Sequence, residues 1–182
     1  MELKMINSLR AINMGVAIAV GLGLLGCAAF VLTDIILRRF GSSLGGTEEI
    51  AGYAMALATS WGMAYTLQEL GHVRIDLLRQ KTGTFARSLF DLFSMIVMSA
   101  VIVTIAIKAW PKVSRSIEMG SRANTPLETP LAWVQLPWFA GWVWFACMCC
   151  IVTLCVLSLI VKRRYGETEA IAGAFAEQET LK

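Results

Sequence analysis

The residues of this chain that are most able to bind a metal are its five cysteines. Four of them crowd one long apolar stretch near the C-terminus, and the fifth lies alone near the N-terminus. In a helix each residue turns by about 100° from the one before, so the four thiols would point to different sides and could not converge on one ion. We interpret them as small apolar side chains and expect neither a metal site nor a disulfide framework. The cysteines are Cys27, Cys147, Cys149, Cys150 and Cys155.

The single histidine, His72, is the next candidate for chemistry, because histidine is the usual axial ligand of haem between membrane helices. Such a haem normally needs two ligands from helix interiors, whereas His72 lies in a predicted loop. No long apolar stretch carries a charged residue near its middle, where proton relays and ion-coupled sites place theirs. The sequence therefore predicts a protein that is not an enzyme, holds no cofactor and contains no substrate-binding residue of its own.

Two short polar constellations remain, and the first surrounds the glycine- and serine-rich stretch 41–46. Asp34 and the run Arg38-Arg39-Phe40 precede the stretch, and Thr47-Glu48-Glu49 follows it. We expect the Thr47 hydroxyl to cap the helix that begins there, with both glutamates at the positive end of the helix dipole.

The second constellation is the run Glu69-Leu70-Gly71-His72-Val73-Arg74-Ile75-Asp76. Gly71 is well placed as the residue that ends a helix in a left-handed conformation. His72 and Asp76 are four positions apart and would meet if that turn is helical. From the residue types alone, we interpret both constellations as helix caps and short amphipathic segments at a membrane interface.

The elements that must position these residues are four long uncharged runs. The runs hold 23 residues between Arg10 and Asp34, 19 between Glu49 and Glu69, 16 between Asp91 and Lys108, and 33 between Glu128 and Lys162. A bilayer core of about 30 Å needs about 20 apolar residues in a helix. The sequence thus predicts an all-α integral membrane protein with four transmembrane helices.

Glycine, proline and tryptophan suggest where each span ends. The predicted spans cover about 11–33, 49–70, 88–109 and 137–161 of a single membrane domain, 1–165, followed by a short cytoplasmic tail, 166–182. Trp110-Pro111 is expected to close the third helix. Pro137 is expected to open the fourth span, with 131–136 lying along the membrane surface.

The distribution of lysine and arginine predicts the orientation. Both termini and the second loop together hold 10 of these residues, and the first and third loops hold 6. The positive-inside rule then places both termini in the cytoplasm.

The overall composition excludes other classes of protein. The chain is 57% hydrophobic and 16% charged, which is far below the charged fraction of about 25% in soluble domains. Its net charge of +3 comes without a basic patch interleaved with stacking aromatics, so nucleic acid is not an expected partner.

With these motifs in order, the chain resembles the DctQ-type small membrane subunit of the tripartite ATP-independent periplasmic (TRAP) transporters. The resemblance covers roughly 23–159. Its pieces are Arg39-Phe40, Thr47-Glu48-Glu49, the run 71–76, Thr125-Pro126-Leu127-Glu128-Thr129-Pro130 and Pro137.

The resemblance implies a scaffold in the bacterial inner membrane for sodium-coupled uptake of an organic acid. The partners would be a large multi-span permease subunit, which would hold sodium and substrate, a periplasmic substrate-binding protein, and membrane lipids. Arg38, Arg39 and Arg122 would then lie on the periplasmic side, where they could meet the binding protein or lipid. The other implied residues hold helix ends and subunit contacts: Glu48, Glu49, Gly71, His72, Arg74 and Asp76.

Two other classes of protein stay open from the residues alone. One is an independent small transporter or channel, which the uncharged spans disfavour. The other is the membrane anchor of an oxidoreductase, which the lone loop histidine disfavours.

Overall fold

A computed structural model describes residues 2–72 and 81–173 of the chain, and this part is helical without any strand. The helices are α1 (Glu2–Arg39), α2 (Thr47–Gln68), α3 (Thr84–Glu118), α4 (Leu131–Val161) and α5 (Tyr165–Ala172). The prediction of an all-α protein is confirmed.

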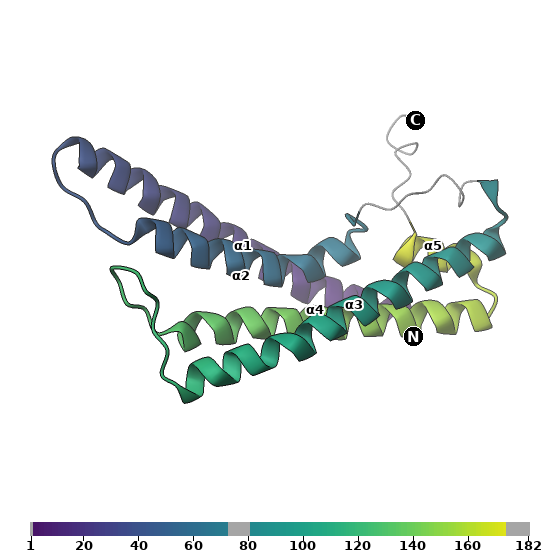
Figure 1. Ribbon diagram of the computed structural model, residues 1–182. Helices are drawn as coiled ribbons and strands as arrows, with labels where there is room; N and C mark the ends of the chain where they lie inside the picture. The colour runs from purple at the N-terminus through teal and green to yellow at the C-terminus, as the bar shows by residue number, and fades with distance from the viewer. Residues whose placement is uncertain (1, 73–80, 174–182) are drawn as a thin grey trace.

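The long helices form two antiparallel hairpins (Figure 1). One joins α1 to α2 through the tight turn 40–46, and the other joins α3 to α4 through the loop 119–130. The hairpins diverge toward the turn 40–46, and the loop 119–130 rises from the end of the second hairpin toward the start of α2. Helix α2 provides most of the contact between the hairpins because it packs against α4.

Buried side chains gather between α3 and α4. Met95 on α3 and Phe145, Met148 and Cys149 on α4 are all buried. A polar link crosses the same interface, where the hydroxyl oxygens of Ser99 and Thr153 are 2.8 Å apart. Hydrogen bonds of this kind are typical between helices in apolar surroundings.

Three helices are long and apolar enough to cross a membrane: α1 over Met5–Arg39, α3 and α4. Helix α2 is not among them, because its 22 residues mix apolar side chains with tyrosine, threonine and serine. The fourth span and the cytoplasmic location of both termini stay predictions.

Two prolines were expected to mark boundaries, Pro111 the end of a helix and Pro137 the start of a membrane span, and both lie inside helices. Pro111 lies within α3, which continues to Glu118, so the prediction that Trp110-Pro111 closes this helix was wrong. Helix α4 begins at Leu131 and runs through Pro137. A proline removes one backbone donor, yet the helix continues past the proline in both places.

The four long helices end in the same way. Soon after each helix comes a residue in the left-handed region, and this residue and the next one donate backbone hydrogen bonds to carbonyl oxygens of the last turns. The left-handed residues are Gly41, Leu70, Gly120 and Arg163. At the end of α2 this residue is Leu70, with φ 55°, and Gly71 donates its N–H to the Thr66 carbonyl at 2.9 Å. The prediction that Gly71 occupies the left-handed position was therefore wrong by one residue. Thr47 is likewise the first helical residue of α2 and not its cap, because Gly46 precedes it with φ 66°.

The short helix α5 folds back against α3 and α4. Its Thr168, Ile171 and Ala172 are buried, and the ring of Tyr165 meets that of Phe85 edge-on, with centroids 5.5 Å apart. Part of the predicted tail is thus packed against the hairpin α3–α4.

Candidate functional site

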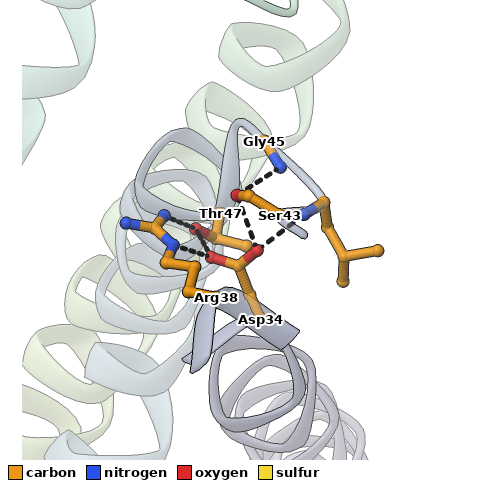
Figure 2. Close-up of polar contacts among 6 residues, drawn as sticks. Asp34, Arg38, Ser43, Gly45 and Thr47 are labelled. Carbon is orange, nitrogen blue, oxygen red and sulfur yellow. Dashed lines mark hydrogen bonds and ion pairs between the residues drawn. The ribbon is translucent and has the colours of Figure 1, made fainter. Parts of the chain in front are cut away.

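The carboxylate of Asp34 organises the turn between α1 and α2. Its side chain is 2% exposed and lies in the last turns of α1 (Figure 2). Oδ1 accepts hydrogen bonds from the backbone N–H of Leu44 at 2.7 Å and from the Ser43 hydroxyl at 3.0 Å. Oδ2 accepts from Arg38 Nε at 2.7 Å and from the Thr47 hydroxyl at 3.1 Å. One buried charge therefore holds the end of α1, the turn and the start of α2 together.

The geometry explains why an aspartate is needed here. A carboxylate offers about four acceptor positions, and all the partners in Figure 2 approach it from one short segment of chain. Arg38 lies one helical turn after Asp34, so the ion pair forms within α1 itself.

Glu49 links the start of α2 to the loop that precedes α4. The Tyr53 hydroxyl donates to Glu49 Oε1 at 2.6 Å. The side chains of Thr125 and Thr129, in the loop that precedes α4, also interact with this carboxylate. These polar groups stabilise the charged carboxylate, so the same interaction stabilises the position of the loop beside the start of α2.

Gly46 and Leu127 make the second contact between the same two segments. A Cβ atom at Gly46 would lie 2.4 Å from the Leu127 side chain, so the leucine fits only against a glycine. The predicted motifs Thr47-Glu48-Glu49 and 125–130 are thus neighbours in space, although about 80 residues separate them along the chain.

A second polar cluster joins α1, α2 and α4 far from that turn. Arg10 donates from Nε and Nη2 to the two carboxylate oxygens of Glu69, at 2.6 and 2.5 Å. Glu69 is the residue that follows the last residue of α2. Beside this pair, the buried Asn13 donates to Gln68 Oε1 at 2.7 Å and accepts from Trp144 Nε1 at 2.8 Å.

His72 lies at the edge of this second cluster. Its ring stacks on that of Phe145 with centroids 5.9 Å apart. Gly71 is close to α2, since an added Cβ would approach Thr66 Cγ2 to 2.9 Å. Arg74 and Asp76 lie outside the described residues.

The remaining predicted residues are at the surface of the chain. Arg38, Arg39 and Glu48 are exposed near the turn 40–46. Arg122 is also exposed, and its Nη1 lies 3.4 Å from the carbonyl oxygen of Glu128.

The five cysteines are free thiols in the described structure. Within residues 2–72 and 81–173, no three histidine, cysteine or acidic side chains gather as metal ligands. The polar clusters described above join helices to one another and to the loop 119–130.

A family model described as the DctQ component of the tripartite ATP-independent periplasmic transporters matches residues 27–163. The chain belongs to this family. It is accordingly a small membrane subunit of a TRAP transporter, a family of transporter components and not of enzymes, and it associates with other TRAP components. No curated protein and no solved structure matched it.

The part of this DctQ-family chain that matches contains Asp34 with its hydrogen-bond partners, Glu49 and the loop 119–130. Arg10 and Asn13 precede the match, and α5 follows it. The sequence had placed Asp34, Arg38, the stretch 41–46 and Thr47 in one polar constellation, and the structure joins them by hydrogen bonds. The sequence carried no indication of the Asn13–Trp144 contact, because nothing local to either residue signals a partner 131 positions away.

Proposed function

We propose that this chain is the fixed scaffold subunit of a TRAP transporter in a bacterial inner membrane, with four spans and both termini in the cytoplasm. A large multi-span permease subunit carries sodium and an organic acid, and a periplasmic binding protein delivers the acid. The observation that supports a scaffold role most directly is that the buried Asp34 makes hydrogen bonds within its own hairpin. Its charge is satisfied by Arg38, Ser43, Leu44 and Thr47 of the same hairpin, so this carboxylate serves to hold helices in place.

Uptake into liposomes tests whether this chain is a scaffold and the large subunit carries the substrate. This chain alone should move neither organic acid nor sodium, whereas the chain with its large subunit, binding protein and a sodium gradient should restore uptake. Liposomes that lack only this chain are the matched control. Substrate-selective flux from this chain alone would contradict the proposal.

Assembly with the large subunit is proposed to involve the end of α2, including Gly71, His72, Arg74 and Asp76, together with Glu48 and Glu49 at its start. His72→Ala should lower maximal uptake and co-purification of the large subunit, with little change in the substrate concentration for half-saturation. His72→Phe is the control because it keeps a ring against Phe145. A large shift in half-saturation with an intact complex would argue against a scaffold.

Arg38, Arg39 and Arg122 are proposed to face the periplasm, where their charge can attract the binding protein or lipid phosphates. Arg39→Glu tests this surface without disturbing the turn, because Arg38 also donates a hydrogen bond to Asp34. Weaker capture of the binding protein by the assembled complex is the expected result. Unchanged capture with both Arg39→Glu and Arg122→Glu would remove these residues from the docking surface.

The topology is tested by cysteine labelling in a background without the five native thiols. Ser42→Cys should react with an impermeant reagent from outside, while Gly83→Cys and Lys162→Cys should be protected. All three positions are exposed in the structure, so burial within the chain does not hide them. Labelling of both Ser42→Cys and Gly83→Cys from outside would mean that α2 does not cross the membrane, and labelling of Gly83→Cys alone would mean that the orientation is reversed.

A further inference from the structure

An apolar groove of about 420 Å³ lies between α1, α2 and α4. It follows α1 from Val16 to Leu24, which corresponds to about 12 Å along a helix. The residues that line it carry no charge. They include Val16, Val20, Gly23, Ala54, Trp61 and Pro137.

The groove is bounded by a fixed wall and small side chains. Trp61 forms part of the wall, and its Nε1 donates to the Pro137 carbonyl oxygen at 2.9 Å. Gly23 borders the groove, and a Cβ built there meets no atom within 4 Å. Facing small residues usually let two helices close on each other, yet here they leave space. Apolar space that nothing fills loses dispersion contacts along its whole lining, so an occupant is favoured.

The shape and lining of the groove suit a hydrocarbon chain. The groove extends for about 12 Å along α1 between apolar side chains, and an extended acyl chain is thin enough to lie along it.

The charges around the groove match a phospholipid. Arg10 lies six residues before Val16, or about 9 Å along α1, and its side chain is 52% exposed. Glu69 binds Nε and Nη2 of its guanidinium, which leaves further N–H donors for a phosphate. A lipid phosphate near Arg10 would place its tail in the groove, since one leaflet of the bilayer core is about 15 Å deep.

We propose that this groove holds one acyl chain of a phospholipid whose phosphate lies near Arg10. This inference goes beyond the proposed scaffold role and does not depend on it.

The test is native mass spectrometry of the full chain, extracted from vesicles of palmitoyl-oleoyl phosphatidylglycerol and phosphatidylethanolamine. The unaltered chain should keep one phospholipid through delipidating washes, identified by its mass and so distinguished from detergent or free fatty acid. Gly23→Leu should displace at least two methylene groups of the acyl chain, which lowers lipid retention by roughly tenfold. Gly21→Leu, on the same helix but outside the groove lining, should retain the lipid.

Both variants are first compared by circular dichroism and gel filtration. If Gly23→Leu does not fold, Ala58→Leu takes its place with Gly62→Leu as control, because Ala58 lines the groove and Gly62 does not. Absence of a retained phospholipid, or equal retention in the groove and control variants, would overturn the proposal. So would efficient crosslinking of Ala54→Cys to a protein partner in the native complex, which would show that a protein side chain fills the groove.

Discussion

Trp144 of α4 donates a hydrogen bond from Nε1 to Oδ1 of Asn13 in α1, at 2.8 Å. Asn13 is 1% exposed, and its amide nitrogen donates in turn to Gln68 of α2. One buried asparagine thus connects three helices from both hairpins. In apolar surroundings such a side chain fixes how helices meet, because any other arrangement leaves its polar atoms unsatisfied.

Trp144→Phe should therefore lower the free energy of unfolding by about 1 kcal/mol, since it removes the donor and leaves Asn13 Oδ1 buried. Unfolding of the purified chain in mixed micelles, followed by circular dichroism, gives the value. Trp133→Phe is the control because that indole is 77% exposed. If Asn13→Ala and Trp144→Phe have additive effects, the two residues are not coupled.

Gly46→Ala should destabilise the chain more than Gly45→Ala. Both glycines have positive φ, 66° and 70°, so both substitutions bring backbone strain of about 1 kcal/mol. Only at Gly46 would the new methyl group also meet Leu127, at 2.4 Å. The difference between the two variants, measured by the same unfolding assay, isolates this contact. Leu127→Ala should reduce that difference, and a difference that persists would count against a steric cause.

Gly141→Ala should weaken the packing of α2 on α4. The added Cβ would lie 2.6 Å from the Ser60 hydroxyl oxygen and 3.0 Å from its backbone carbon, so a backbone shift is needed. Overpacking of this kind costs about 1–3 kcal/mol. Gly62→Ala is the matched control, with no atom within 4 Å of the new methyl group. Hydrogen exchange should rise along α2 in the first variant only.

Leu70→Gly should stabilise the chain by up to about 1 kcal/mol, because leucine is strained at φ 55° and glycine is not. Gly71→Leu should act in the opposite direction through its contact with Thr66. Thermal unfolding of both variants gives the signs. A loss of stability in Leu70→Gly would show that the leucine side chain contributes more than its backbone conformation costs.

The sequence was sufficient to predict the four long helices and the family, because long uncharged runs and ordered motifs are local signals. It misplaced features that depend on three-dimensional context. Pro111 was expected to end a helix on intrinsic preference, yet α3 continues past it. Gly71 was expected to take the left-handed conformation because glycine does so most easily, but the hydrogen bonds place that conformation at Leu70.

The sequence carries a local signal for one contact of Asp34 but none for the contact between Glu49 and the loop 119–130. The spacing of Asp34 and Arg38 indicates an ion pair on one helix face. The proximity of Glu49 to 125–129 carries no such local signature, because it depends on how the loop 119–130 bends back over α2.

The contacts at Asn13 and α5 also bear on how small this protein can be made. A version trimmed to the family-matched residues 27–163 would lose Asn13 and Arg10, which tie α1 to α2 and, through Asn13, to α4. It would also lose α5 and uncover the surface of α3 and α4 that Ile171 and Ala172 protect. Such a minimal unit would keep only 27–39 of α1, which is too short to cross a bilayer. Its α1–α2 hairpin should therefore pack poorly, because residues before the family match hold α1 against α2 and α4.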